Sequence, residues 1–463
     1  MQDAMTDSTR IRELISTQRA FFRSGETRSI TYRRRQLREL KAAIQAREQE
    51  VLDALYADLR KSAVEAYTTE LGLVYREISH ALRRVGRWAR PRRVRTDIFN
   101  LPGRSTVYPE PYGVSLIIAP WNYPFQLLFL PLIGAIAAGN TAVVKPSEYA
   151  PAVAEMTATI LGERFPAEYL AAVQGNADTA RALTAEDFDH IFYTGSKQVG
   201  AKVMAAASER LIPVTLELGG KSPTIVDETA NLDVAARQIV FGKSINAGQT
   251  CVAPDYVLVQ ESVHEALLEK LRSATETFFA GNPQGHSRYS RIINERHFDR
   301  LAGMIDPSLV YLGGERDRDD LYMAPTVLSG VTMDHPVMQE EIFGPILPVL
   351  RYRELDEAIS IIRERPKPLA LYLFTRSRDH ERRVREAVPF GGGAVNATIM
   401  HVASTYLPFG GVGPSGMGRY HGRASFDCFS HRKGILRQPG FFENPLAYPN
   451  SKARLGLLKR ILK

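Results

Sequence analysis

The strongest constraint on the fold is an alternation of short β-like runs with longer helix-like runs that begins near Val107. Strands separated by helices indicate a parallel sheet whose crossover connections are helical. The sequence therefore predicts an α/β unit in the first half of the chain. Its β-like runs are residues 114–119, 141–145, 171–174, 190–193 and 214–218, and its helix-like runs are 124–138, 151–165, 178–185 and 196–208.

A second series of alternating runs follows Cys251 and predicts a second α/β unit. No internal repeat or low-complexity linker separates the two series, so we expect the units to pack tightly with residues 215–253 between them. The first ninety residues instead carry apolar stripes at helical spacing and predict helices that end at Arg90-Pro91. In the second unit the β-like runs are 256–260, 309–312, 346–350, 369–375 and 395–398, with helices near 264–280 and 354–363.

Length and composition favour a globular protein. The 463 residues and 44% hydrophobic composition are ample for a large core and correspond to about three domain-sized units. Two cysteines cannot form a disulfide framework, and the residues before Arg10 lack an apolar signal core, which predicts a reducing, cytoplasmic setting. The apolar run 127–138 contains Pro131 and Gly134 and is shorter than the roughly twenty residues that span a bilayer, so we expect a buried helix.

The net charge is +8, and basic residues cluster at 33–35, at 83–95 and in the C-terminal tail. Such clusters could bind nucleic acid, yet the arginines of 83–95 alternate with apolar residues at helical spacing and accompany no nucleic-acid motif. Solvated helix faces explain them better, so no nucleic-acid partner is expected. The ten histidines form no cluster with ligand spacing, and no metal site is expected either.

Cys251 is the strongest candidate for a catalytic side chain. It lies in a loop rich in Gly, Ala and Thr, where a thiolate could attack a substrate and form a thioester that water then hydrolyses with the help of a carboxylate. The alternative is a small buried hydrophobic side chain, which describes most free cysteines. The cysteine alone does not decide between the two.

Motifs spread over residues 109–431 decide it, because in them the chain resembles the aldehyde dehydrogenase superfamily. The central pair is Glu217-Leu-Gly-Gly-Lys-Ser-Pro followed by Gly248-Gln-Thr-Cys251, at the spacing that the superfamily shows. The further motifs are Pro120-Trp-Asn-Tyr-Pro124, Lys145-Pro-Ser-Glu148, Phe192-Tyr-Thr-Gly-Ser196, Glu340-Glu-Ile-Phe-Gly-Pro345 and Leu407-Pro-Phe-Gly-Gly-Val-Gly413.

The resemblance implies oxidation of an aldehyde to a carboxylic acid through a thiohemiacetal and a thioester. Cys251 is then the nucleophile, Glu217 the general base, and Asn122 an oxyanion donor together with the Cys251 backbone amide. Removing one donor to such an oxyanion typically costs about two to three powers of ten in rate. Judged by position alone, Asn122 would be a helix cap, because asparagine is common at helix starts.

The resemblance also implies NAD as the cofactor, with NADP as the alternative. The early βα turns lack Gly-x-Gly-x-x-Gly, but Gly195, Ser196 and Gly200 lie at a strand-to-helix junction whose amides could receive a pyrophosphate. Without the resemblance these would be plain capping residues. The counterparts of Lys145 and Glu148 bind the adenosine ribose, where a carboxylate disfavours a 2′-phosphate. A solvated lysine and a helix-starting glutamate are the alternative.

Trp121, Glu341 and Phe343 complete the implied cofactor site. Glu341 and Phe343 match the residues that hold the nicotinamide ribose and line the nicotinamide. Without the adjacent Gly344-Pro345, a capping glutamate and a core phenylalanine would be the better explanation of this pair.

The resemblance implies an aldehyde dehydrogenase-like fold in three parts. Residues 1–81 and 105–216 form a Rossmann-like NAD-binding domain, and residues 217–415 form the catalytic domain. Residues 82–104 and 416–463 form a small bridging or oligomerisation element with the C-terminal tail.

Among subfamilies, the chain most resembles class 3 and fatty or aromatic (coniferyl-type) aldehyde dehydrogenases. Those enzymes are dimeric and oxidise medium or long aliphatic and aromatic aldehydes, so we expect an aldehyde substrate and a homodimer. Ala397 and Pro414 depart from the usual aspartate and asparagine near the expected substrate entrance or subunit contact, and they bear on substrate range. Residues 425–430 alternate apolar and polar side chains around Cys428 and predict a strand near the subunit interface.

The tail 449–463 combines leucines on one helical face with five basic residues, which is typical of a short interfacial helix. It could touch a membrane surface weakly or cover the partner subunit.

Two competing functions remain at this point. A coenzyme-A-acylating relative would lack the glutamate found at Glu217, and a basic membrane-surface or nucleic-acid-binding protein on an inactive enzyme fold would have lost Cys251 or Asn122.

Overall fold

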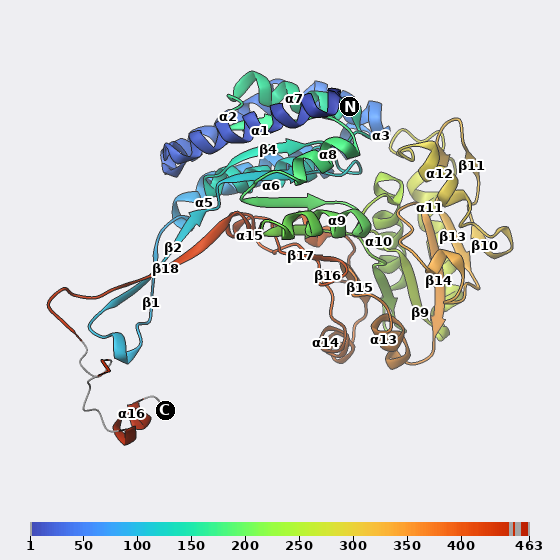
Figure 1. The fold of residues 1–463 in the computed structure, drawn as a ribbon. Coiled ribbons are helices and arrows are strands. Elements are labelled where there is room, and N and C mark those ends of the chain that lie inside the picture. Colours follow the sequence, from blue (N-terminus) through green and yellow to red (C-terminus); the bar gives the residue numbers. More distant parts are fainter. Residues whose placement is uncertain (1, 444–447, 450–454, 462–463) are drawn as a thin grey trace.

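A computed structural model gives the fold and describes residues 2–443, 448–449 and 455–461. Two α/β bodies lie side by side, and an arm of paired strands projects away from the first of them (Figure 1). The α/β fold predicted from the alternating runs is confirmed. Among the described residues, no helix is long and apolar enough to cross a membrane.

The first body is built on a six-stranded sheet with the order β17-β7-β6-β3-β4-β5. Strands β3 to β7 run parallel, and β17 pairs antiparallel with β7. The strand order reverses at β3, and open α/β sheets bind ligands at the carboxyl ends of the strands beside such a reversal. The strands are β3 (Val114–Ile118), β4 (Thr141–Lys145), β5 (Leu170–Ala172), β6 (His190–Thr194), β7 (Val214–Glu217) and β17 (Gly416–Met417).

Helices cover both faces of this sheet because successive residues of each strand point to opposite sides. Leu116 and Ile118 of β3 join a core with α1, α8 and α9, whereas Ile117 joins a larger core with α2, α5, α6 and α7. Every residue of α6 is buried, which confirms the buried helix predicted for 127–138. These helices are α1 (Gln2–Arg23), α2 (Ile30–Ala46), α5 (Gly72–Trp88), α6 (Gln126–Ala138), α7 (Pro151–Arg164), α8 (Ala177–Thr184) and α9 (Lys197–Ser208).

The helical first ninety residues are also confirmed. Between α2 and α5 the chain forms α3 (Glu48–Leu59) and α4 (Ala63–Ala66), and then one turn of π-helix at Tyr67–Leu71. π-Helical turns are rare and occur often at functional sites. This turn lies close to the start of α6.

The second body contains a seven-stranded sheet with the order β10-β13-β14-β9-β8-β15-β16. All neighbours run parallel except β10, which is antiparallel to β13. The strands are β8 (Pro223–Val226), β9 (Tyr256–Gln260), β10 (Val310–Leu312), β13 (Thr326–Ser329), β14 (Ile346–Tyr352), β15 (Ala370–Phe374) and β16 (Gly392–Val395). Its helices are α10 (Leu232–Ser244), α11 (His264–Phe279), α12 (Glu295–Ala302), α13 (Leu355–Arg363) and α14 (Arg378–Ala387), and a small ribbon joins β11 (Arg316–Asp317) to β12 (Tyr322–Met323).

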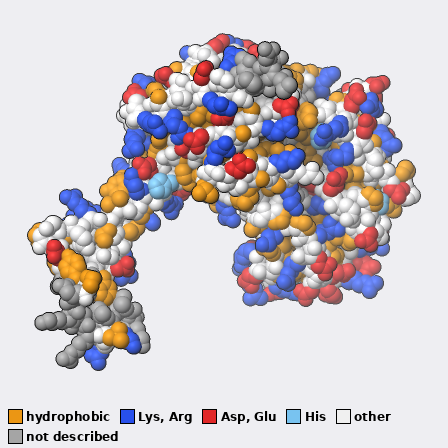
Figure 2. Space-filling model, viewed as in Figure 1, with side chains coloured by type: hydrophobic (Ala, Val, Ile, Leu, Met, Phe, Trp, Pro, Cys, Tyr) orange, Lys and Arg blue, Asp and Glu red, His pale blue; other side chains and the backbone are white. Residues whose placement is uncertain are grey.

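The arm is a three-stranded antiparallel sheet of β1 (Arg92–Val94), β2 (Arg104–Pro111) and β18 (Ser430–Arg437). Figure 2 shows hydrophobic side chains on this arm, and α16 (Leu455–Ile461) follows it. The remainder of the predicted interfacial helix, 450–454 and 462–463, lies outside the described residues. Exposed apolar residues of the arm and its continuation include Val94, Ile98, Leu101, Ile435, Leu436 and Phe441.

One local prediction is wrong near Cys428. Residues 425–430 were predicted as a strand, but α15 (Arg423–Cys428) is a helix, and strand β18 begins only at Ser430. The helix packs against α6 at Gly134, where an added Cβ would lie 2.8 Å from Ser425 Cβ. Tertiary packing on this glycine therefore overrides the local alternation.

The last strand of the second sheet is also shifted. It was predicted at 395–398, but β16 ends at Val395 and contains two glycines. A Cβ on Gly393 would lie 2.0 Å from Leu371 O of the neighbouring strand. The glycines permit this close approach of two backbones.

Candidate active site

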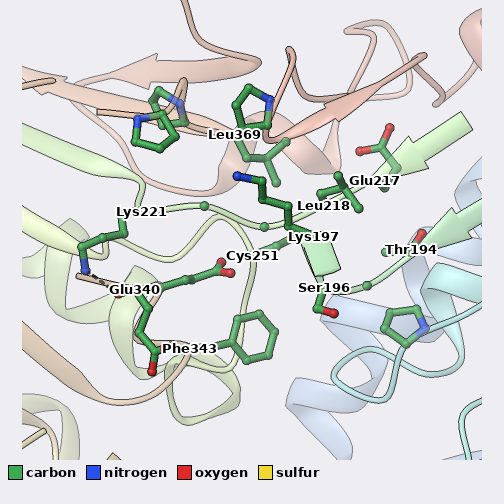
Figure 3. Close-up of a pocket in the computed structure, with 18 of the residues that line it drawn as sticks. Thr194, Ser196, Lys197, Glu217, Leu218, Lys221, Cys251, Glu340, Phe343 and Leu369 are labelled. Atoms are coloured by element: carbon green, nitrogen blue, oxygen red, sulfur yellow. Dashed lines mark hydrogen bonds between the residues drawn. The ribbon is translucent and has the colours of Figure 1, made fainter. Parts of the chain in front are cut away.

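A cavity of about 510 Å³ opens where the carboxyl ends of β6 and β7 meet the second body (Figure 3). Parallel strands bring the loops that follow them to one edge of the sheet, so both junctions reach the same space. Lys145, Glu148 and Gly200 are not among the residues that line it. The predicted site residues that do line it are Trp121, Asn122, Gly195, Ser196, Glu217, Cys251, Glu341 and Phe343.

Cys251 is carried by a loop that turns sharply after α10. Asn246, Ala247 and Gly248 adopt positive φ angles of 52°, 50° and 73°. Such backbone is costly for residues other than glycine and persists only where surrounding contacts impose it. One of these contacts is the Asn246 N–H, which donates to Glu65 Oε1 at 2.7 Å.

The Cys251 thiol is half-buried and held in its neutral form. Burial, together with the charges of Glu341 and Glu217, raises its pKa to about 12, while its own backbone amide and that of Val252 oppose the shift. A thiolate is the reactive species. The site must therefore provide a proton acceptor or a positive charge before this sulfur attacks a carbonyl carbon.

Glu217 is the last residue of β7 and is buried at the cavity wall. Neither of its carboxylate oxygens has a hydrogen-bond partner among the described residues. Burial raises its pKa well above the ordinary value, and Arg419 opposes this shift. A carboxyl group with a raised pKa beside a reactive thiol is suited to accept a proton near neutral pH.

Asn122 is buried just before α6 and faces the loop that carries Cys251. Its Nδ2 donates to Gln249 O at 3.0 Å. A carboxamide has two N–H donors, so this bond leaves a second one for a ligand in the cavity. The alternative of a helix cap is not observed, because the N-cap position of α6 is Phe125 and the Asn122 amide bonds to Gln249 O.

Gly195 and Ser196 form the turn between β6 and α9. The Gly195 N–H donates to Glu217 O at 3.0 Å, which fixes the turn to the end of β7. Ser196 is the N-cap of α9 and accepts the Val199 N–H at 3.4 Å. Gly200 is a buried residue of α9. An added Cβ there would lie 2.6 Å from Leu218 Cδ2, so the absence of a side chain allows this close packing.

Lys145 and Glu148 lie at the carboxyl end of β4, two strands away from β6 in the same sheet. Lys145 Nζ lies 2.6 Å from Glu148 Oε2, and the lysine is buried while the glutamate is partly exposed. The pair is at the edge where the cavity opens but outside its lining. This position suits contact with an extended ligand that runs along the edge of the sheet.

Glu341 and Phe343 reach the cavity from the second body. Burial, together with the charge of Asp255, raises the pKa of Glu341 to about 8, while the Gly220 N–H and Lys221 oppose the shift. Phe343 adopts a positive φ of 53°, which is unusual for a bulky residue. Its ring packs edge-on against Trp121, with centroids 5.3 Å apart.

Several residues around the site were not assigned a role from the sequence. Tyr420 and His297 line the cavity, and the buried pair Lys61 and Glu70 lies behind Asn122, with the partly buried Glu65 nearby. Lys61 lies between α3 and α4, Glu65 lies in α4 and Glu70 lies in the π-helical turn, and charged side chains in such a segment are normally expected to face solvent. Among the described residues, no three potential metal ligands converge, and the sequence motifs gave no signal for these buried charges.

Comparison with known proteins identifies the family. The aldehyde dehydrogenase family model matches residues 2–435. Over 447 residues, the chain is 48% identical to 4,4'-diaponeurosporen-aldehyde dehydrogenase of Staphylococcus aureus, with 96% of this chain and 97% of that protein covered. Aldehyde dehydrogenase family 3 member A2 of Mus musculus is 44% identical over 447 residues, with 96% of this chain and 92% of that protein covered.

A solved structure agrees with the sequence relatives. The substrate-bound state of Staphylococcus aureus AldH superimposes with a TM-score of 0.96 at 47% identity and covers 98% of this chain and 99% of that one. The match spans both α/β bodies and the loops that line the cavity. The chain therefore belongs to the aldehyde dehydrogenase family.

Proposed function

We propose that this enzyme oxidises aldehydes to carboxylic acids through a thioester on Cys251. The observation that carries the proposal is the convergence of Cys251, Glu217 and Asn122 on one cavity, each from a different element. A half-buried nucleophile, a carboxyl group with a raised pKa and an amide donor suit acyl chemistry at a carbonyl.

In the proposed reaction, the Cys251 thiol releases its proton to solvent through the cavity, and Sγ then forms a bond to the aldehyde carbon while the carbonyl π-electrons move onto oxygen. The oxygen that gains negative charge accepts hydrogen bonds from Asn122 Nδ2 and the Cys251 backbone N–H. A bound NAD would supply the hydride acceptor, and loss of hydride from the carbon attached to Cys251 Sγ would convert the adduct to a thioester. Glu217 then takes a proton from water, whose oxygen attacks the thioester carbon, and the Cys251 thiolate departs as the carboxylic acid is released.

The residues present fit the dinucleotide. The N-terminus of α9 offers free backbone amides beside Ser196, which suits a pyrophosphate. Glu341 and Phe343 line the cavity near Cys251, where they would hold the nicotinamide ribose and the ring, with Trp121 packed against Phe343.

NAD is the proposed cofactor in preference to NADP. The carboxylate of Glu148 would accept hydrogen bonds from ribose hydroxyls and repel a 2′-phosphate. Relatives differ in this respect. A Sinorhizobium meliloti structure, 30% identical with a TM-score of 0.85, is a NAD-dependent aldehyde dehydrogenase, whereas a Canis lupus familiaris relative, 41% identical, is dimeric and NADP-preferring.

The proposed substrates are medium or long aliphatic and aromatic aldehydes. Support comes from the relatives, which include a 4,4'-diaponeurosporen-aldehyde dehydrogenase and family 3 members. A panel of aliphatic and aromatic aldehydes, assayed for NADH and NADPH formation side by side, tests substrate range and cofactor together. Reduction of neither cofactor with any aldehyde would reject the proposal, and NADH formation that requires coenzyme A would favour acyl transfer to a thiol instead of hydrolysis.

The proposed domain boundaries are those predicted from the sequence. Residues 1–81 and 105–216 would bind the cofactor, residues 217–415 would carry the catalytic groups, and 82–104 with 416–463 would join two subunits of a homodimer. The exposed apolar side chains of the arm support such a contact between subunits. Light scattering measures whether the protein is a dimer.

The proposed location is cytoplasmic, with weak peripheral membrane contact through the tail. Flotation with anionic vesicles, before and after deletion of residues 450–463, tests this contact.

A further inference from the structure

A fully buried ion pair lies behind Asn122. Lys61 Nζ lies 2.5 Å from Glu70 Oε1, and both side chains are 0% exposed. Removing two charges from water costs solvation free energy, so such a pair adds little net stability compared with apolar packing. The importance of the Lys61–Glu70 pair lies in the backbone groups to which the two side chains bond. Lys61 Nζ also donates to Asn122 O at 2.9 Å and lies 3.9 Å from the centre of the Tyr123 ring.

Glu70 fixes the chain on the other side of Asn122. Its Oε2 accepts the N–H groups of Phe125 at 3.0 Å and Gln126 at 3.1 Å. These donors lie at the start of α6, where the helix has N–H groups without partners inside the helix. One ion pair therefore fixes the backbone at Asn122 itself and again three and four residues later.

The same carbonyl of Asn122 connects to the loop that carries Cys251. Asn246 Nδ2 donates to Asn122 O at 2.7 Å and to Gln249 O at 3.2 Å. Gln249 O in turn accepts Asn122 Nδ2 at 3.0 Å. Asn122 and the loop before Cys251 thus share two carbonyl oxygens, and Lys61 bonds to one of them.

We propose that Lys61 and Glu70 are positioning residues that set the Asn122 amide relative to Cys251, and so determine how well the oxyanion is held. Neither side chain lines the cavity, so they act through Asn122. The inference rests on the proposed oxidation and adds residues from the N-terminal helices to its machinery. A misplacement of about 1 Å at such a donor costs on the order of 100-fold in rate.

The far end of α6 supplies a matched control. Arg33 is also buried, donates to Ala137 O at 3.1 Å from Nη1, and donates to Thr27 O at 2.8 Å from Nε. Arg33→Met therefore removes a buried cation that bonds to the carbonyl end of the same helix, away from Asn122. Arg33→Met should therefore destabilise the protein as Lys61→Met does, but it should leave the Asn122 amide in place.

The experiment measures the rate of NADH formation in a single turnover, with saturating NAD and aldehyde, and the dissociation constant of NAD by fluorescence. Lys61→Met should slow NADH formation about 100-fold, while the NAD dissociation constant stays within about twofold because the cofactor does not touch this pair. The neutral double variant Lys61→Met/Glu70→Gln should be slowed as much. It leaves no buried charge without a partner and so guards against a variant that does not fold.

A double-mutant cycle separates positioning from general stability. In an Asn122→Ala background, adding Lys61→Met should slow the reaction by less than about threefold, because the donor that it orients is already gone. Arg33→Met should leave the rate within about threefold in both backgrounds. Equal slowing by Lys61→Met with and without Asn122, or slowing by Arg33→Met as large as that by Lys61→Met, would overturn the proposal. An unsubstituted enzyme that forms no NADH would reject the proposed function instead.

Discussion

The Glu341 carboxylate occupies the space that a side chain on Gly219 would need. A Cβ added to Gly219 would lie 2.0 Å from Glu341 Oε2. Gly220, the next residue, donates its N–H to the same carboxylate, and a Cβ there would meet its nearest atom only at 3.7 Å. The missing side chain at Gly219 thus lets a residue of the second body approach the end of β7.

Gly219→Ala should displace Glu341 and weaken the contact proposed for it with the nicotinamide ribose. The added methyl group would meet only the carboxylate at the flexible end of the Glu341 side chain, so we expect the unfolding free energy to change by less than about 1 kcal/mol. The KM for NAD should rise about tenfold, equivalent to about 1.4 kcal/mol. Gly220→Ala is the control and should leave KM unchanged. Steady-state kinetics with chemical denaturation distinguish the two, and equal KM values would show that Glu341 does not hold the cofactor.

Cys251→Ala should abolish oxidation while NAD still binds, because the sulfur forms the covalent bond and does not hold the cofactor. Cys428→Ser should retain activity. Cys428 Sγ lies 3.1 Å from Thr215 Oγ1, and a serine hydroxyl can make the same contact. NADH formation by both variants, with NAD titrations by fluorescence, checks this. Turnover by Cys251→Ala would reject its role as nucleophile.

Glu217→Gln should separate the two chemical halves of the reaction. The amide has the shape of the carboxyl group but cannot take a proton from water, so the thioester should persist. Stopped-flow absorbance should show one NADH per site in a burst, followed by turnover reduced at least about 100-fold. Loss of the burst as well would show that Glu217 also removes the Cys251 proton.

Glu148→Gln should improve the use of NADP. Removal of the carboxylate ends its repulsion of the 2′-phosphate, and we expect the ratio of kcat/KM for NADP to that for NAD to rise about tenfold, which corresponds to about 1.4 kcal/mol. Glu163→Gln, which removes an exposed carboxylate paired with Arg47, is the control. An unchanged ratio in Glu148→Gln would place this side chain away from the ribose.

Glu77 predicts a pH dependence of stability. Burial raises its pKa from 4.5 to about 7, and its Oε1 accepts the Gly422 N–H at 2.7 Å. The folded state therefore keeps a proton that the unfolded chain has lost, and this stabilisation is full below pH 4.5 and disappears as the pH rises through 7. Between those limits the unfolding free energy should fall by on the order of 3 kcal/mol from this group.

Glu77→Gln carries no such proton and should lack that slope. Urea unfolding of both proteins from pH 4.5 to 8 measures the difference, and the variant should gain stability relative to the parent as the pH rises. Identical slopes would mean that Glu77 is ionised in the fold at neutral pH.

The sequence was sufficient for the parts of the fold in which local pattern and tertiary packing agree. The first sheet and α6 follow from runs of apolar residues, which are buried in any α/β arrangement. Residues 425–430 have the period of a strand, yet α15 is helical because Gly134 of α6 admits a helix at that point. No local pattern carries information about a glycine almost three hundred residues earlier in the chain.

The candidate site shows the same division. The residues of the site were found because short motifs mark the loops after β6 and β7 and the loop of Cys251. Lys61 and Glu70 could not be found in this way, since charged residues outside a recognised motif are normally solvated. Only the three-dimensional structure shows both at 0% exposure and bonded to the backbone around Asn122.

The strand pairing of β17 constrains synthesis of the protein as well as its fold. Gly416 pairs with Glu217, and Met417 pairs with Leu216, across almost two hundred residues. Until this late segment has been synthesised, β7 exposes its backbone edge at Leu216 and Glu217, and exposed edges of this kind promote aggregation. A fragment truncated after residue 217 would keep that edge open, so the first sheet is complete only after residues 416–417 have left the ribosome.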